Sequence, residues 1–292
     1  MRILVIGGTG FISAHVVRQL VSHEHSVTVF HRGSTQALLP DSVCHIVNPQ
    51  SAIPIEVYPA QILDLHPDIV ILAVTMGAPD AAAAMKAFAD YAGRIVLLSS
   101  GDVYQAYGRF AGIEGGAVDN ELLKETAPLR SVLFPYRGKA SSRGDLNYWY
   151  EKILAERAVL SIARLPGTVL RLPKVYGPGG NQNLATVYRN SLHREWRWTH
   201  GYVENVAAAI VLAATHPAAM GGIYNIGESY TPTIGERLAW LPLSTSAPDL
   251  DTHFDFRQNV AFDTSRIRCE LGYREIISEK EGALRTLESS SH

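Results

Sequence analysis

The stretch that most constrains the fold lies at the start of the chain, where an apolar run leads through glycines into a helical pattern. "RILVIGG" (2–8) predicts a buried strand, and "FISAHVVRQLVSH" (11–23) has apolar residues at helical spacing. Between them, Gly7 and Gly10 stand in G-x-x-G spacing. Glycine there lets the backbone approach a pyrophosphate, and the following helix directs unpaired N–H groups and the positive end of its dipole toward it. The pattern favours a dinucleotide-binding loop, with a plain tight turn as the alternative.

The neighbours of this loop fit the same interpretation. Ser13 occupies the third position of the usual glycine motif and is small enough for close packing of helix on strand. We expect Phe11 and Ile12, at the helix start, and Ala73, near the end of a later strand, to contact the cofactor. The sequence "HEH" (23–25) has i, i+2 spacing without further ligands, so no metal site is expected.

The first half of the chain repeats the alternation of strand and helix. Predicted strands are 26–32, 68–74, 94–100, 168–177 and 222–228, and predicted helices are 79–93, 145–161 and 205–216. Apolar strands that each lead into a helix indicate parallel pairing with both faces of the sheet covered. The sequence therefore predicts an α/β fold with a doubly wound parallel sheet, the Rossmann fold, whose ligands bind beyond the carboxyl ends of the strands.

The pattern loosens after Gly177, which suggests a small second domain. We expect residues 1–177 plus about 205–228 to form the dinucleotide-binding domain. Residues 178–204 plus 229–292 would form a small C-terminal substrate-binding cap. No linker rich in Pro, Gly or Ser separates them, so the cap is expected to be docked and not tethered.

Composition excludes several classes of function. With 47% hydrophobic and 18% charged residues and a net charge of −2, the chain resembles a soluble globular protein without general attraction to nucleic acid or anionic membranes. Its two cysteines, Cys44 and Cys269, are far apart, which suits a reducing compartment. We expect a cytoplasmic protein with a small-molecule substrate, no membrane contact, and no nucleic-acid partner.

The end of the second predicted strand bears on the choice of cofactor. NAD-selective sites usually place Asp or Glu there to hold the adenosine ribose, but this chain has His31 followed by Arg32. A guanidinium suits a 2′-phosphate, and no carboxylate repels it. NADP is therefore favoured over NAD, unless Arg32 merely stacks on adenine.

The sequence "NYWYEK" supplies a candidate acid/base group. In a helix over 145–161, Tyr148 lies over Lys152 four positions later, while Tyr150 points away. A nearby ammonium favours the phenolate and lowers the pKa of the phenol, so Tyr148 could pass a proton to or from a substrate oxygen.

Taken together, these motifs resemble the extended short-chain dehydrogenase/reductases, the NAD-dependent epimerase/dehydratase family. The resemblance runs over nearly the whole chain and rests on "ILVIGGTGFI", "IVLLSSGDVY", "YWYEK", "LRLPKVYGPG", "GYVENVAAAI", "YNIGE" and "DTSRIRCELGY". It implies that Ser100 hydrogen-bonds the reacting oxygen, that Tyr148 moves the proton and that Lys152 also holds the nicotinamide ribose. Pro173 would border the nicotinamide. It also implies a homodimer formed by helices near 79–93 and 147–161, although the Ala-rich helix could equally serve internal packing.

Departures from the family pattern narrow the chemistry. Dehydratases carry two adjacent carboxylates after the Ser/Thr, whereas here Gly101 precedes Asp102, which also suits a turn cap. Lys174 stands where many sugar-nucleotide enzymes have Asn and could meet an anionic group of the substrate. A basic segment with Arg130, Arg137, Lys139 and Arg143 precedes the catalytic helix, as a solvated loop or a lid for phosphate or carboxylate.

The leading hypothesis is an NAD(P)-dependent epimerase or reductase. It would transfer hydride at a secondary alcohol or ketone carbon of a sugar-nucleotide or a smaller carbonyl substrate. Reduction and epimerisation both stay open, and the short cap favours a smaller substrate. The alternative is a non-catalytic dinucleotide-sensing or RNA-binding module of the same fold, for which "HREWRW" (193–198) could serve, although core packing explains that sequence too.

Overall fold

A computed structural model describes residues 1–35, 37–244, 248 and 253–289. The chain forms two compact units, each built from separate segments. The first unit contains Met1–Ser100, Leu133–Arg171 and Ala207–Ile223, and the second contains Gly101–Val132, Leu172–Val206 and Tyr224–His292.

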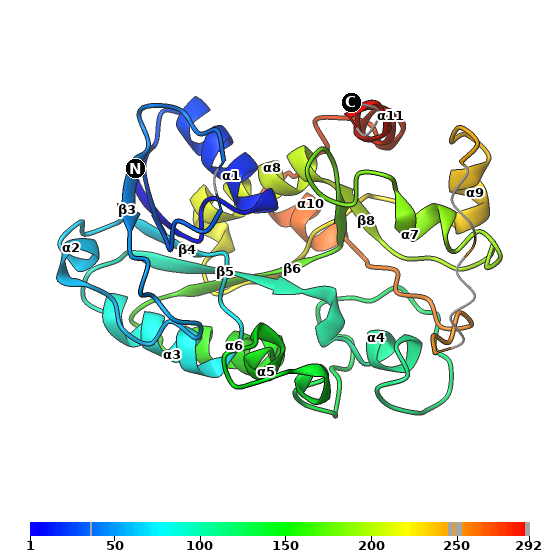
Figure 1. Cartoon of the computed structure of the whole chain (residues 1–292), viewed down its shortest axis with the longest axis horizontal. Coiled ribbons are helices and arrows are strands. Elements are labelled where there is room, and N and C mark those ends of the chain that lie inside the picture. Colours follow the sequence, from blue (N-terminus) through cyan, green and yellow to red (C-terminus); the bar gives the residue numbers. More distant parts are fainter. Residues whose placement is uncertain (36, 245–247, 249–252, 290–292) are drawn as a thin grey trace. The chain divides into compact units, whose positions relative to one another are not determined.

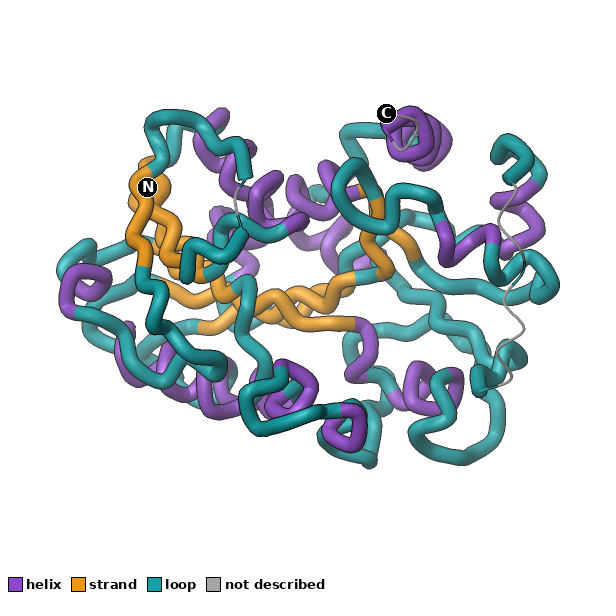
Figure 2. The backbone as a smooth tube through the Cα atoms, in the orientation of Figure 1, coloured by secondary structure: helices purple, strands orange, loops and turns teal. Residues whose placement is uncertain are grey.

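The first unit contains the doubly wound sheet that the sequence predicts. Within the described residues, seven strands pair in the order β3-β2-β1-β4-β5-β6-β9, and the pairs β1–β2, β1–β4, β2–β3 and β4–β5 are parallel. The strands are β1 (Arg2–Ile6), β2 (Ser26–His31), β3 (Cys44–Val47), β4 (Ile69–Leu72), β5 (Arg94–Ser100), β6 (Gly167–Leu172) and β9 (Ile223–Asn225). The chain order reverses between β1 and β4, and this is where such sheets bind ligands. Figure 2 shows these strands as the central band of the unit.

Helices cover both faces of this sheet. They are α1 (Phe11–Ser22), α2 (Ala60–Leu63), α3 (Ala78–Phe88), α5 (Leu146–Trp149), α6 (Lys152–Val159) and α8 (Val203–Thr215), with short 3₁₀ turns η2 (Arg137–Lys139) and η3 (Pro217–Ala219). Figure 1 shows α1 and α8 on one face and α3 and α6 on the other. Ala81 and Ala84 of α3 are fully buried in the core beneath the sheet, so part of this Ala-rich helix serves internal packing. The homodimer stays a prediction.

The second unit has little regular structure. It contains η1 (Gly101–Val103), α4 (Gln105–Phe110), β7 (Lys174–Tyr176), α7 (Ala185–Tyr188), β8 (His200–Tyr202), α9 (Ile234–Leu238), α10 (Ser265–Leu271) and α11 (Glu279–Ser289). β7 and β8 pair in parallel, with Lys174 opposite His200. The expected strand 168–177 is thus divided at Pro173, since proline lacks the N–H that would continue the ladder.

The division between the units differs from the expected boundary at one large segment. Residues 101–132, expected in the nucleotide domain, belong to the second unit. The Tyr104 hydroxyl donates to Asn225 Oδ1 at 2.6 Å, and Leu123 pairs with Phe262, so the partners of this segment lie in that unit. Within the expected cap, positions 245–247, 249–252 and 290–292 lie outside the described residues.

Most predicted elements of the first unit are confirmed. The strand at 94–100 has the predicted bounds, and helix 11–23 ends one residue early. The prediction of one helix over 145–161 is wrong, because α5 ends at Trp149 and α6 starts at Lys152. Across the described residues, no helix is both long enough and apolar enough to span a bilayer.

Candidate active site

The loop after β1 has a conformation that requires glycine at its first position. Gly7 has φ of 87°, and a Cβ added there would lie 2.3 Å from Val74 Cγ1. Its N–H donates to Phe30 O at 2.8 Å, which joins the loop to β2. Gly7 is therefore fixed by the chain itself, through both backbone conformation and space.

Gly10 differs, and the difference indicates a ligand. Its φ of −78° and ψ of 172° are open to any residue, and the nearest atom to an added Cβ is Ser13 Oγ at 3.3 Å. The packing of the chain thus makes only a mild demand for glycine here. A side chain would instead fill the space over the first turn of α1, where helix N–H groups point outward. This cradle fits a dinucleotide pyrophosphate, and Phe11 and Ile12 form the helix turn beside it.

Ser13 does more than the sequence predicts. Its hydroxyl donates to Gly7 O at 2.6 Å and accepts from Gly10 N at 3.0 Å. The side chain therefore braces both ends of the loop, which a glycine or alanine at this position could not do.

A cavity of about 180 Å³ adjoins the loop and carries the predicted selectivity residues. Gly7, Gly10, His31, Arg32, Ser34 and Thr35 are among its lining residues. The hydroxyls of Thr9 and Thr35 are 2.7 Å apart and close one side. Ala73 follows β4, and its N–H donates to Ile6 O, which places it beside the end of β1. The structure thus brings most of the predicted cofactor residues of this unit to one edge of the sheet.

His31 has a partner that the sequence did not reveal. Its Nδ1 accepts from Gly33 N at 3.2 Å, so its Nε2 carries the proton toward His45 Nδ1 at 3.1 Å. Burial and the neighbouring His45 lower the pKa of His31, which keeps the ring neutral near neutral pH. Arg32 is then the permanent positive charge among these residues. His45 could not be identified from the sequence, because it lies on β3, where only Ile46 is buried and the apolar residues show no strand periodicity.

Lys152 is held firmly at the carboxyl ends of two strands. It is 6% exposed, and its Nζ donates to Thr75 O and to Leu98 O, the latter at 3.0 Å. Its charge also acts on buried Asp80, whose carboxylate accepts from the N–H groups of Met76 and Gly77. Burial raises the pKa of Asp80, and these hydrogen bonds and the ammonium oppose that change. These contacts fix the ammonium group of Lys152 as a buried positive charge at this edge of the sheet.

The tyrosine near this ammonium is not the one expected. Lys152 Nζ lies 5.8 Å from the ring centroid of Tyr150. The Tyr148 ring instead lies beside the guanidinium groups of Arg137, at 4.7 Å, and Arg143, at 5.8 Å. The predicted stacking of Tyr148 over Lys152 in one helix is wrong for this conformation, because the helix is interrupted between them.

Glu151 explains the interruption. It has φ of −157° and ψ of 90°, and its side chain accepts from Ile153 N as the N-cap of α6. It is 0% exposed, its other oxygen accepts from Phe134 N, and its own N–H donates to Met76 O at 2.8 Å. A capped start forces α6 to begin at Lys152. In the sequence, the acidic residue directly before Lys152 was the one indication that a new helix could begin there.

A buried ion pair holds α6 on the sheet. Glu156, one turn after Lys152, accepts from Arg171 at 3.1 and 2.7 Å and from Ser99 Oγ at 2.5 Å. All of these groups are buried. The arrangement ties α6 to β5, where Ser100 is the last residue, and to β6. The sequence reasoning missed Glu156 and Arg171.

The basic residues before the catalytic helix belong to both units: Arg130 lies in the second, and Arg137, Lys139 and Arg143 lie in the first. Arg137 stacks on Phe134 at 3.5 Å and donates to Tyr148 O at 3.1 Å, so it holds the segment before α6 together. Arg130 belongs to the second unit, where it is 3% exposed and donates to Asp102 O and Val132 O. The possible lid therefore cannot include Arg130.

The remaining predicted residues lie in the second unit. Asp102 is buried in the 3₁₀ turn η1. A Cβ at the preceding Gly101 would lie 2.2 Å from Phe262 Cζ, which leaves no room for the second dehydratase carboxylate. Pro173 separates β6 from β7, and burial lowers the pKa of Lys174, whose Nζ lies 5.4 Å from the Trp198 ring. The predicted roles of Asp102, Pro173 and Lys174 at the reacting atoms stay predictions.

The model of the NAD dependent epimerase/dehydratase family matches residues 3–90 and 144–227. The curated 2'-dehydrokanamycin reductase of Streptomyces kanamyceticus is 37% identical over 100 residues, 34% of this chain. That match takes in 28% of the reductase's length.

Solved structures agree in fold at low identity. UDP-glucose 4-epimerase of Thermotoga maritima, in complex with UDP-glucose, has a TM-score of 0.73 and 20% identity over 100% of this chain and 99% of that one. UDP-glucuronic acid 4-epimerase of Bacillus cereus, in complex with NAD, has a TM-score of 0.70 and 16% identity over 100% and 99%. Pal from Bacillus thuringiensis has a TM-score of 0.72 and 19% identity over 100% and 99%. The fold and the family match, which covers more than half of the chain, lead to one conclusion: this chain belongs to the NAD-dependent epimerase/dehydratase family.

Proposed function

We propose that the protein is an NADP(H)-dependent oxidoreductase or epimerase acting at a secondary alcohol or ketone carbon of a sugar-type substrate. The observation that carries the proposal is the Gly10 cradle at the start of α1, open to a ligand and continuous with the cavity lined by His31 and Arg32. Arg32 would pair with the 2′-phosphate. His31 would carry no charge near neutral pH, because its pKa is lowered, so it would not form an ion pair with the phosphate.

The chemistry divides between the cofactor and the chain. The nicotinamide would accept or return hydride at the substrate carbon. Lys152, fixed by two carbonyl oxygens, would supply positive charge that favours a phenolate and would hold the nicotinamide ribose. Ser100 would donate a hydrogen bond to the substrate oxygen, and Tyr148 would transfer the proton there.

Tyr148 can serve only if α5 and α6 join. In a helix continuous through Tyr150 and Glu151, Tyr148 stands one turn before Lys152 and on its face. This requires Glu151 to adopt helical backbone angles and to release Ile153 N. Tyr150, whose ring is already near the ammonium, is the rival for the role.

Support for a sugar substrate comes from the relatives. The similar structures include epimerases of UDP-glucose and UDP-glucuronic acid, and the curated relative is by name a reductase of 2'-dehydrokanamycin. Because Gly101 excludes the second carboxylate, we propose epimerisation or reduction and not dehydration. We propose that the protein acts as a cytoplasmic homodimer.

The test is turnover with a defined substrate set. Purified protein is incubated with NADPH and 4-keto sugar-nucleotides, and separately with UDP-glucose and UDP-glucuronic acid while the sugar proton signals are followed by NMR. NADPH oxidation or epimer formation supports the proposal. Binding of NADPH without either reaction would favour the non-catalytic dinucleotide-sensing module, and salt-dependent RNA retention would favour the RNA-binding one.

A further inference from the structure

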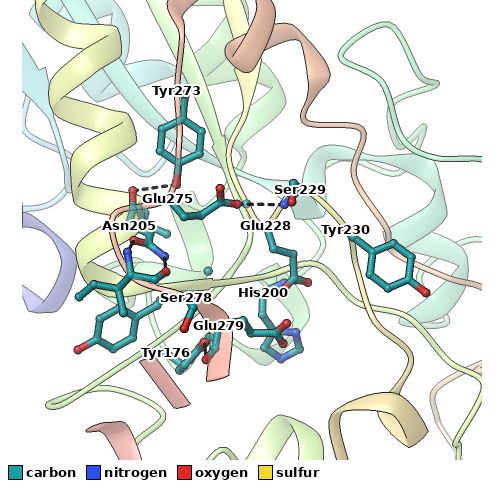
Figure 3. A pocket seen from close by; sticks show the side chains of 15 residues that line it. Tyr176, His200, Asn205, Glu228, Ser229, Tyr230, Tyr273, Glu275, Ser278 and Glu279 are labelled. Carbon is teal, nitrogen blue, oxygen red and sulfur yellow. Dashed lines mark hydrogen bonds between the residues drawn. The ribbon is translucent and has the colours of Figure 1, made fainter. Parts of the chain in front are cut away.

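A second cavity lies entirely within the second unit. Its volume is about 290 Å³, at the lower end of the range for small-molecule sites. β7, β8, the start of α8 and the segment before α11 contribute to its wall. Figure 3 shows the carboxylates of Glu228 and Glu279 near the His200 ring, with Tyr230 to one side and Tyr176 and Ser278 to the other.

Two of the three carboxylates that line this cavity share one cation. Glu275 is satisfied, because Arg268 binds both of its oxygens at 2.6 and 2.8 Å and Ser229 N donates to it at 3.0 Å. Glu228 and Glu279, by contrast, share the single guanidinium of Arg237. One cation thus faces two carboxylates in a partly buried space.

The histidine on the wall is not a second cation. His200 is 1% exposed, its Nδ1 lies 2.7 Å from Trp198 O, and its Nε2 lies 3.0 Å from Thr186 Oγ1. Burial lowers its pKa well below the ordinary value, and the charges of Arg237 and Lys174 act in the same direction. The imidazole is neutral, so it places no positive charge beside the two carboxylates.

Aromatic rings form much of the rest of the wall. The hydroxyl protons of Tyr176, Tyr230 and Tyr273 are donated to Glu279 O, Glu236 and Asn205 O respectively. These tyrosines can therefore offer a ligand ring faces and oxygen lone pairs, both of which attract cations. The wall is acceptor-rich.

The carboxylates are not arranged for a metal ion. In the described part of the chain, no cluster of three or more His, Cys, Asp or Glu side chains converges closely enough to hold one. Arg237 also retains a buried Nε–H without an acceptor among these residues. A ligand hydroxyl could satisfy such a donor, which a bare cation could not.

We propose that this cavity binds a primary ammonium group carried by a small hydroxylated molecule of about the size of one sugar ring, and that the ammonium pairs with Glu228 and Glu279. The two carboxylates that share one guanidinium, the aromatic wall and the cavity volume each favour such a ligand. None of the predicted dinucleotide-binding residues lines this cavity, and the proposal does not rest on the proposed function.

Protonation provides an independent readout. Burial raises the pKa of Glu228 to about 7, although Arg237 opposes this change. An ammonium placed beside Glu228 favours its ionised form, so binding near neutral pH should release protons. Titration calorimetry in two buffers of different ionisation enthalpy measures this release directly.

The test compares ligands that share a ring and differ in charge. Glucosamine, N-acetylglucosamine and glucose are titrated into the full-length protein without dinucleotide. We expect glucosamine to bind with proton release and the two neutral sugars to bind at least tenfold more weakly. A weak site has a Kd of about 1 mM, so glucosamine is titrated to about 20 mM. Equal binding of all three sugars, or no binding of glucosamine at that concentration, would overturn the proposal.

A matched pair of variants locates the site. Glu279→Gln removes one charge from the cavity, and Glu281→Gln removes one from the same helix, where Glu281 pairs with Arg285 at the surface. We expect the first to weaken glucosamine binding at least tenfold and the second to leave it unchanged. If Glu279→Gln fails to fold, Glu228→Gln replaces it, and unchanged affinity in a folded cavity variant contradicts the site.

Discussion

The ammonium group of Lys152 lies 5.8 Å from the ring of Tyr150, whereas the ring of Tyr148 lies 4.7 Å from the guanidinium of Arg137. Sequence spacing and the observed geometry therefore select different tyrosines as the partner of the lysine. The difference arises at Glu151, which caps α6 and ends the continuity of the predicted helix.

Substitution of each tyrosine separates the two assignments. Tyr148→Phe should lower kcat by about 10²–10⁴, the usual contribution of general acid/base catalysis, with the Kd for NADPH retained. Tyr150→Phe, the matched control, should leave kcat near the wild-type value. The opposite pattern in steady-state kinetics would transfer the proton-transfer role to Tyr150.

Arg32 should determine the choice of cofactor. Arg32→Gln removes one charge-assisted contact with the 2′-phosphate, worth about 1.5–3 kcal/mol, or about tenfold or more in Kd. Arg32→Asp should go further and favour NAD by repulsion. Titration of both dinucleotides measures the ratio, and an unchanged ratio in Arg32→Asp would show that Arg32 does not read the phosphate.

Gly101 should be intolerant of any side chain. Its added Cβ would overlap the Phe262 ring, so Gly101→Ala should cost about 1–3 kcal/mol in the free energy of unfolding. Phe262→Leu in the same chain should recover part of this loss by making room. Urea denaturation measures both, and equal stability of wild type and Gly101→Ala would refute the steric explanation for the missing carboxylate.

The buried pair of Glu156 and Arg171 should contribute far more than a surface pair. Glu156→Gln leaves Arg171 buried without its countercharge, and the expected cost is about 3–5 kcal/mol. Asp90→Asn breaks the exposed pair with Arg164, and its cost should lie within about 1 kcal/mol. Similar losses in chemical denaturation would contradict this ranking.

The pH dependence of stability should reveal Glu228. Its pKa is raised from 4.5 to about 7 in the folded chain, so folding favours its protonated form. Its stabilising contribution is complete below pH 4.5 and is lost as the pH rises through about 7. Glu228→Gln should remove this slope from the free energy of unfolding, and an identical slope in the variant would mean that another group titrates.

The sheet and its loop could be predicted because their signals are local. A buried parallel strand is apolar along its length, as in β5, and Gly7 precedes a helix whose apolar spacing is regular. By contrast, β3 has one buried residue, and no pattern could identify it or His45.

The catalytic helix could not be predicted in detail because its start depends on distant contacts. Helical spacing at Tyr148 and Lys152 is satisfied in sequence, yet Glu151 finds Phe134 N and Met76 O as partners, far along the chain. The tertiary hydrogen bonds of this buried residue outweigh its helix propensity, because propensities of ordinary residues differ by only about 0.7 kcal/mol or less.

Calorimetric titration of wild type and Gly10→Ala with NADPH and NADH tests most directly whether the cradle at Gly10 holds a phosphorylated dinucleotide. We predict that wild type binds NADPH more tightly than NADH and that Gly10→Ala binds neither while it stays folded. The nearest chain atom to the added Cβ is Ser13 Oγ, at 3.3 Å. Folded wild-type protein that binds neither dinucleotide, or Gly10→Ala that binds both as wild type does, would contradict this prediction.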